Sequence, residues 1–367
     1  MFKVDGVATE KPEGLAPEVG ERIFRFVKRI AGLDIEEIRK PQKGKIEVSL
    51  LSHEGGVGDT EVHSSGTTAG ERLRLKFHTD NRLYRIPELG LADARSEELK
   101  KILEKPTGLF LMSAPTQHGL TTTQYAILRS HDAYINNIHS LERRPLAEVD
   151  NITQQRFDGA NTDVNYARML QTVLRREPNM VMIGECEDRD TACVALRAAA
   201  DGRKIYLGIN GKDCFEVLGK YLAFVGDNAL VAKALLGVMS QRLVRTLCSE
   251  CREAFEPDTA TLKKLNLPAD KIERFYRAPS EPKTDRRGRP IECMQCQGTG
   301  FVGRTGIYEL LVVDEPVAKL IAMGAATNRI KSQCRKRRMY YLQEEALLKV
   351  IDGTTSMDEI LRCLRGG

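Results

Sequence analysis

Short apolar segments alternate with helix-like stretches in the middle of the chain, and this alternation constrains the fold more than any other feature. The clearest apolar segments are Leu109–Met112, Met180–Ile183 and Ile205–Leu207. Such segments are typical of strands that are buried on both faces of a parallel sheet. Because helix-like residues flank them, they predict βαβ crossovers and an α/β fold.

The length of the chain predicts more than one domain. It has 367 residues, whereas compact domains usually hold about 100–200. We expect a small mixed α+β module over residues 1–96 and a parallel-sheet domain over residues 97–367. No fixed-period repeat is present, so solenoids and propellers are set aside.

Local patterns place the elements of the first module. We expect an amphipathic helix over Pro17–Ala31, then strands over Lys45–Leu51 and Arg72–His78 on either side of a Gly/Ser-rich hairpin region. A helix over Ser96–Glu104 should lead into the second domain, where the break at Pro106–Gly108 precedes its first buried strand.

The C-terminal part carries a cysteine-bearing insertion, over residues 246–303, and then a helical tail over residues 317–367. Within the tail, Gly353 and Thr354–Ser356 predict a turn followed by a helix N-cap. The tail also contains the basic run Arg335–Arg338, which we interpret first as a solvated helix face.

Composition narrows the function classes. Lys+Arg 56 against Asp+Glu 51 gives a net charge of +5, well below the clustered charge of a dedicated nucleic-acid binder. Neither a secretory signal nor an apolar run of roughly 18 residues is recognisable, so we expect a cytoplasmic protein. In that reducing compartment, nine cysteines indicate metal binding or buried thiols before disulfides.

The segment after the strand Leu109–Met112 has the context of a phosphate-binding loop, because a strand there runs through a glycine-containing loop into a helix. The pattern G-x-x-x-x-G-K-[ST] would place glycine at 114 and 119, lysine at 120 and a hydroxyl at 121. Only Gly119 and Thr121 comply. The degenerate loop comprises Pro115, Thr116, Gln117, His118, Gly119, Leu120, Thr121 and Thr122.

Leu120 is the most consequential departure. A lysine there would contact the β- and γ-phosphates, and a hydrogen bond to a charged group contributes roughly 1.5–3 kcal/mol. Leucine should therefore weaken triphosphate binding by about tenfold or more, and hydrolysis should suffer further. Read alone, the segment also fits an ordinary strand–loop–helix junction.

Glu185 follows the predicted strand Met180–Ile183. A carboxylate released at the carboxyl end of a buried strand lies where α/β sheets bind ligands, and in nucleotide hydrolases it organises Mg²⁺ or water. An acidic residue in this place is also a routine helix start, so Glu185 is a candidate catalytic residue with a structural alternative.

Four cysteines form two Cys-x-x-Cys pairs, with 41 residues between the pairs. Four thiolates complete the tetrahedral shell that Zn²⁺ prefers in closed structural sites. We therefore predict a structural zinc site, with buried free thiols as the alternative, and a helix over Leu262–Arg277 inside the intervening loop. The predicted ligands are Cys248, Cys251, Cys293 and Cys296.

Together these features resemble the hexameric ATPases of type II secretion and type IV pilus assembly. The phrases that carry the resemblance are Arg39–Ile46, Arg175–Thr191, Gln241–Cys248 and Gly303–Leu311. The similarity spans the chain from about residue 20 to its end.

The resemblance implies a PAS-like module at 1–96, joined to a RecA-like P-loop-type domain at 97–367 with nucleotide between them. It also implies a homo- or hetero-hexamer, formed with itself or a paralogue, that drives an inner-membrane secretion or pilus platform. The protein would then be cytoplasmic or peripheral at the inner membrane. The docking domain that family members commonly carry ahead of this module has no recognisable counterpart, which puts the usual membrane attachment in doubt.

The departures from the family concentrate on its chemistry. Where members read close to I-E-D-P, this chain has Leu141-Glu142-Arg143-Arg144-Pro145, so Glu142 remains as a candidate water-activating base while Arg143 replaces an acid. Asn210 replaces the histidine of the family's L-H-T-N-D box. Three arginines that would face the nucleotide correspond to Lys45, Glu61 and Lys76.

These observations support a family member with weak or lost ATP hydrolysis and a structural or regulatory role, in effect a pseudo-ATPase. One alternative is an active motor in which another cation replaces the loop lysine, such as Lys204, Lys212 or an arginine of a neighbouring subunit. Whether ATP and Mg²⁺ bind, and whether the chain is an enzyme, stays open at this point. A minor alternative is a nucleic-acid-associated protein that uses Arg335–Arg338, although few aromatic side chains offer stacking platforms.

Overall fold

The computed structural model describes residues 2–5, 7–9, 16–46, 57–68, 70–79, 83–159, 165–265, 267, 272–281, 283–284 and 290–365. The chain divides into two compact units, Met1–Arg82 and Leu83–Gly367. Residues 83–96, which the sequence grouped with the first module, belong to the second unit by their contacts: the hydroxyl of Tyr308 donates to the carbonyl of Leu89 over 3.1 Å. None of the described helices is both long and apolar enough to span a bilayer.

The first unit contains helix α1 (Pro17–Ile30) and an antiparallel sheet in the order β3 (Gln42–Ile46), β4 (Val57–Thr67), β5 (Gly70–Thr79). Strands β1 (Phe2–Val4) and β2 (Val7–Thr9) form a separate pair. Val27 and Ala31 bury their side chains against Val62 of β4.

The helix predicted at Pro17–Ala31 and the strand predicted at Arg72–His78 are confirmed by α1 and β5. Of the strand predicted at Lys45–Leu51, Lys45 and Ile46 lie in β3, and residues 47–51 fall outside the described part of the chain. The Gly/Ser-rich region contains β4, whose small polar residues hide its strand pattern.

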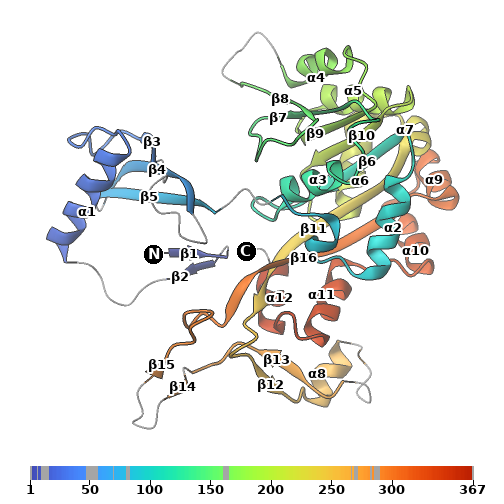
Figure 1. Ribbon diagram of the computed structural model, residues 1–367. Helices are drawn as coiled ribbons and strands as arrows, with labels where there is room; N and C mark the ends of the chain where they lie inside the picture. The colour runs from blue at the N-terminus through green and yellow to red at the C-terminus, as the bar shows by residue number, and fades with distance from the viewer. Residues whose placement is uncertain are drawn as a thin grey trace. The chain divides into compact units, whose positions relative to one another are not determined.

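A mixed, mostly parallel sheet of seven strands organises the second unit (Figure 1), in the order β16-β11-β6-β10-β9-β7-β8. Only β16 runs antiparallel, beside β11. The three predicted strands are confirmed within β6, β9 and β10, as is the α/β fold class. The bounds are β6 Gly108–Ser113, β7 Ile138–Glu142, β8 Thr153–Arg156, β9 Met180–Cys186, β10 Lys204–Ile209, β11 Leu235–Leu247 and β16 Phe301–Val312.

Helices cover both faces of this sheet, and the alternation within β6 shows why. Leu109 and Leu111 enter the core cluster on one face, whereas Phe110 and Met112 enter the cluster on the other. The first face is covered by α4 (Tyr166–Leu174), α5 (Arg189–Ala200), α6 (Cys214–Val225), α7 (Asn228–Ala234), α9 (Glu315–Ala322) and α10 (Thr327–Lys336). The second is covered by η1 (Ile86–Leu89), α2 (Asp93–Leu103) and α3 (Leu120–Leu128).

Strands β11 and β16 continue past the rest of the sheet toward the cysteine-bearing insertion (Figure 1). The insertion contains β12 (Glu253–Phe255), α8 (Thr259–Lys264), β13 (Phe275–Arg277), β14 (Lys283–Thr284) and β15 (Pro290–Ile291). The helix predicted over Leu262–Arg277 is wrong beyond α8. Its last three residues instead pair with β12, and the buried ring of Phe275 packs edge-on against Phe255 at 6.2 Å between centroids.

The helical tail is confirmed as α9 and α10 followed by α11 (Leu342–Ile351) and α12 (Met357–Leu364). The predicted turn and cap are present as well. Gly353 has φ 73°, which favours glycine, and the Ser356 hydroxyl accepts from the backbone N–H of Glu359 at the start of α12. Helices α11 and α12 bury Leu342, Ala346 and Ile360 against the insertion in a third core cluster.

Candidate functional site

The loop between β6 and α3 has the predicted strand–loop–helix geometry. It lies at the carboxyl edge of the central strand, where parallel sheets bind ligands. Gly119 caps α3 with φ 81°, and a side chain there would meet Gln241 Nε2 and Leu243 Cδ1, each at 3.3 Å. The backbone conformation therefore favours glycine at 119, and a side chain there would also displace these two neighbours slightly.

Strand β11 holds this loop in place through His118. The amide of Gln241 donates to the carbonyl oxygen of His118 over 2.8 Å, and the backbone N–H of Leu243 donates to its Nδ1 over 2.9 Å. Since Nδ1 accepts a hydrogen bond, the imidazole is fixed in one orientation. The carbonyl oxygen and Nδ1 of His118 are thus both committed to the strand beside the loop.

Leu120, in the position of the missing lysine, is half-buried and packs against the core cluster beneath α3. Lys204 does not replace the missing lysine, because it is the first residue of β10 and so lies at the amino-terminal end of the parallel strands, away from the loop. Its ammonium donates to the carbonyl oxygens of Ile102 (2.8 Å) and Leu103 (2.7 Å). Lys212 is nearer the loop. It is exposed and follows Gly211, whose carbonyl accepts from the Ser113 hydroxyl at the end of β6 over 2.8 Å.

Glu142 ends strand β7 and is buried, with both carboxylate oxygens engaged. The hydroxyl of Tyr125 donates to one oxygen over 2.8 Å and the hydroxyl of Ser140 to the other over 2.6 Å. Tyr125 in turn accepts from the backbone N–H of Leu146 and the amide of Gln154, each over 3.0 Å. Burial and the neighbouring Glu142 raise the pKa of Tyr125 above its usual value, so this hydroxyl remains a donor.

Arg143 joins the ends of β7 and β9. Its Nε lies 3.0 Å from the carboxylate of Glu185, and its NH2 lies 2.9 Å from that of Glu187. The guanidinium also lies over two aromatic rings, 5.2 Å from the centroid of Phe157 and 5.3 Å from that of Tyr166. The candidate residue Glu185 is therefore paired with the arginine that stands where the family pattern has an acid.

The carboxylates that the described residues place at this edge do not fit a Mg²⁺ site. Asp188, which follows β9, accepts from the backbone N–H and the hydroxyl of Thr191 as the N-cap of α5. Glu142 is held by hydroxyl groups, and Glu185 and Glu187 by Arg143. A divalent cation would have to displace these partners before it reached its preferred oxygen ligands.

In the first unit, the three positions that correspond to nucleotide-facing arginines form one row across the sheet. Lys45 of β3 is the register partner of Glu61 in β4, which is the partner of Lys76 in β5. The ammonium of Lys76 lies 3.5 Å from the Glu61 carboxylate. Exposed pairs of this kind add at most about 1 kcal/mol to stability, so the principal effect of Glu61 is to cancel positive charge within the row.

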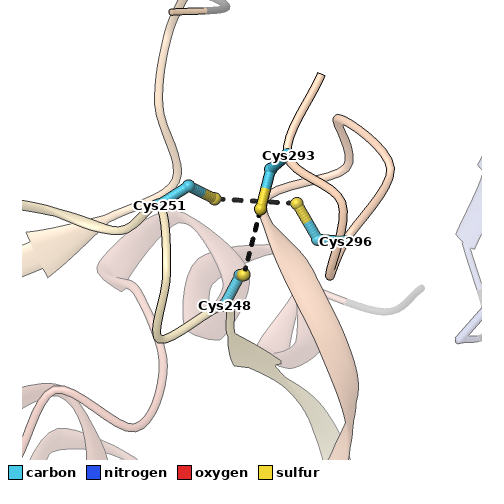
Figure 2. A group of neighbouring side chains, drawn as sticks. All are labelled: Cys248, Cys251, Cys293 and Cys296. Carbon is cyan, nitrogen blue, oxygen red and sulfur yellow. Dashed lines mark hydrogen bonds between the residues drawn. The ribbon is translucent and has the colours of Figure 1, made fainter. Parts of the chain in front are cut away.

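The four predicted cysteines converge at the base of the insertion (Figure 2). All four Sγ atoms lie within 4.8 Å of one another. The Sγ atoms of Cys248 and Cys293 are 3.7 Å apart, and those of Cys251 and Cys296 are 3.6 Å apart. Four sulfurs at about 2.3 Å from a tetrahedral Zn²⁺ would be about 3.8 Å apart. The cluster is compatible with a structural metal such as zinc.

The β11–β16 ladder explains why residues so distant in sequence meet. Leu247 at the end of β11 pairs with Phe301 at the start of β16, so the first cysteine pair follows one strand and the second precedes the other. The second pair sits in a tight knuckle, in which the backbone N–H of Gln297 donates to the carbonyl of Cys293 over 2.7 Å and that of Gly300 to Cys296 Sγ over 3.3 Å.

The electrostatics of the knuckle also favour metal. The backbone N–H groups of Cys296 and Gln295 lower the pKa of the Cys293 thiol to about 7 against a smaller effect of desolvation. Burial raises the pKa of Cys248 and of Cys251, so these two thiols need a bound metal ion to stabilise their thiolates.

The basic run in the tail is partly neutralised. Arg335 forms a 2.7 Å ion pair with Glu344, and Arg337 pairs with Asp314. These contacts favour the structural interpretation of the run and weaken the nucleic-acid alternative.

Sequence reasoning placed His118 in the degenerate loop but did not foresee its contact with β11. It did not identify Tyr125, which holds Glu142. A tyrosine in α3 gives no sequence signal for such a role. Arg143 was visible as a departure, but its pairing with Glu185 and Glu187 depends on the juxtaposition of β7 and β9.

Comparison with known proteins gives a consistent result. The family model described as type II/IV secretion system protein matches residues 1–362. The type IV pilus assembly ATPase PilB of Thermus thermophilus is 30% identical over 365 residues, which are 98% of this chain and 39% of that protein. The type II secretion system ATPase E of Vibrio cholerae is 30% identical over 98% of this chain and 68% of that protein. The chain thus spans well under half of the first relative and about two thirds of the second.

Solved structures share the fold. The ATPase DotB of Legionella pneumophila superposes with a TM-score of 0.62 at 16% identity, over 94% of this chain and 84% of that one. The pilus retraction motor PilT, solved with bound ADP, gives a TM-score of 0.57 at 16% identity over 88% and 77% of the two chains.

Proposed function

Because the chain belongs to the type II/IV secretion system protein family, we propose that it is a secretion or pilus-assembly subunit with weak or lost ATP hydrolysis and a structural or regulatory role. The observation that carries this proposal is Leu120, a half-buried apolar side chain that packs against the core in the position where a phosphate-loop lysine would meet the triphosphate.

The acidic edge of the sheet supports the same proposal. A water-activating base needs a carboxylate oxygen within reach of water, whereas Glu142 is 3% exposed and both of its oxygens accept hydrogen bonds. Glu185 is paired with Arg143. The first unit contributes to the same loss of charge through Glu61.

The remaining roles follow from the family. We propose that the subunit assembles as a homo- or hetero-hexamer, with itself or with an active paralogue. It would act in the cytoplasm or at the inner membrane, on a secretion or pilus platform protein. Its PAS-like and RecA-like modules would correspond to residues 1–96 and 97–367, and Cys248, Cys251, Cys293 and Cys296 would hold one structural zinc ion.

An active motor with a non-standard loop is the second candidate, and the position of Lys212 favours it. This lysine follows Gly211, which contacts the end of β6. In that case Lys212 would supply the missing positive charge, with Glu142 and Glu185 as the catalytic carboxylates.

The two candidates are separated by ATP turnover of the zinc-loaded full chain with Mg²⁺. If the chain is a pseudo-ATPase, the wild type should release phosphate no faster than the Glu185→Gln variant does. Turnover well above background that Glu185→Gln and Lys212→Met both abolish would establish the motor instead. The control for loss of a lysine is Lys233→Met. Lys233 lies on α7, far from the loop in sequence.

A further inference from the structure

At the carboxyl edge of the sheet, the chain places a cation of its own where its family's chemistry would need a metal ion. We propose that the Arg143 guanidinium acts as a built-in counter-cation for Glu185 and Glu187 and excludes divalent cations from this edge. The inference shares one assumption with the proposed function, namely that this edge of the sheet corresponds to the nucleotide site of the family.

Geometry fixes Arg143 in that role. Its Nη2 donates a hydrogen bond to the Glu187 carboxylate over 2.9 Å, and its Nε lies 3.0 Å from the Glu185 carboxylate as an ion pair without hydrogen-bond geometry. The guanidinium lies against Phe157, which directly follows β8, and Tyr166, which begins α4. Those two rings are themselves in edge contact, with centroids 5.1 Å apart.

The aromatic walls are anchored to the same strand as the arginine. The Tyr166 hydroxyl donates to the carbonyl of Leu141 over 2.7 Å, and the backbone N–H of Phe157 donates to that of Glu142 over 2.7 Å. The two rings are thus fixed, and they restrict the side chain of Arg143, which is 36% exposed.

Stability does not explain this arrangement. The side chains of Glu185 and Glu187 are 50% and 67% exposed, and pairs with that much solvent contribute little to folding. The clearest consequence of these ion pairs is local charge, because Arg143 offsets one of the two negative charges that a divalent cation would need and occupies the space beside both carboxylates.

The test uses Mn²⁺ alone as the probe, without nucleotide, and measures its binding to the zinc-loaded full chain by electron paramagnetic resonance. Mn²⁺ prefers oxygen ligands, so the cysteine cluster does not compete. We expect no site at this edge in the wild type. Arg143→Asp, which restores the acid of the family pattern, should gain one Mn²⁺ site at least about tenfold tighter than any in the wild type.

Matched variants locate the gain. Arg144→Asp makes the same charge change on the next, exposed side chain and should not create the site. Adding Glu185→Gln to Arg143→Asp should remove it. Arg143→Gln keeps much of the aliphatic part of the side chain and should produce a smaller gain in Mn²⁺ affinity. This variant tests the proposal if Arg143→Asp disturbs the fold.

Two results would overturn the proposal. One is a wild-type Mn²⁺ site that Glu185→Gln abolishes, a measurement that does not depend on whether the arginine variants fold. The other is an equal gain in folded Arg143→Asp and Arg144→Asp. The Mn²⁺ measurements do not report on ATP turnover. Turnover by the wild type would therefore contradict the proposed function without contradicting this inference.

Discussion

Lys204, which the sequence offered as a substitute for the phosphate-loop lysine, has a structural role instead. Its side chain has no exposed surface, and its ammonium donates to three carbonyl oxygens at and beyond the end of α2, those of Ile102, Leu103 and Lys105. Burial lowers its pKa to about 8. The sequence shows a lysine at the start of a strand, but not that the end of α2 lies against it.

Replacing Lys204 should therefore destabilise the second unit. Lys204→Met leaves buried carbonyls without a donor, which costs about 2–4 kcal/mol in total. Urea unfolding followed by far-ultraviolet circular dichroism measures the loss, since the chain has no tryptophan. The exposed Lys212→Met is the control and should change the free energy of unfolding by less than about 0.5 kcal/mol. Equal effects of both changes would contradict this role.

Among the secondary-structure elements, the paired strands β11 and β16 connect three parts of the second unit: the loop between β6 and α3, the cysteine cluster and the helical tail. Its apolar residues were visible in sequence, and the tail helices were predicted correctly. The ion pairs that attach α12 were not predictable, because Arg245 and Glu359 belong to distant segments that meet only after the sheet forms. Arg245 makes two side-chain bonds to the buried Glu359 carboxylate, of 3.0 Å and 2.8 Å.

This attachment gives stability a pH dependence with a definite sign. Burial would raise the pKa of Glu359, but hydrogen bonds from Arg362 and Arg245 outweigh it and lower the pKa to about 2. Because the folded carboxylate has the lower pKa, its contribution is complete above the unfolded value, near 4.3, and is lost as the pH falls toward 2.

Glu359→Gln should therefore lower the free energy of unfolding by about 2–4 kcal/mol at pH 7. The difference from the wild type should shrink as the pH is lowered from about 4.5 toward 2, as measured by urea titrations across that range. Glu315→Gln, at an exposed pair with Lys319, should change little at any pH. A wild-type advantage that stays constant down to pH 2 would contradict the assignment.

At the scale of the whole molecule, the sequence predicted the α/β class, the buried strands and the four cysteines that meet. The N-terminal sheet was harder to predict, because β4 is rich in small polar residues. The internal pairing of charges was beyond prediction as well. Glu61 with Lys76, and Arg143 with Glu185, become partners only through strand register and sheet order.

Zinc should stabilise the second unit as a whole, because the cysteine cluster joins the ends of β11 and β16. Removing the metal with a chelator should lower the melting temperature by several degrees, since a ligand in large excess over its Kd adds about 3–4 kcal/mol to the folded state. Calorimetry before and after chelation measures this. Cys293→Ser should reproduce the loss and Cys193→Ser, outside the cluster, should not; an unchanged melting curve after complete zinc removal would contradict the site.

The central claim is that the chain keeps the family's architecture while its charges for handling a triphosphate are missing or paired internally. A calorimetric ATP-binding isotherm, recorded with and without Mg²⁺ on the zinc-loaded full chain, tests it most directly. The account predicts no binding at micromolar ATP in either condition. Micromolar binding that requires Mg²⁺ would contradict it.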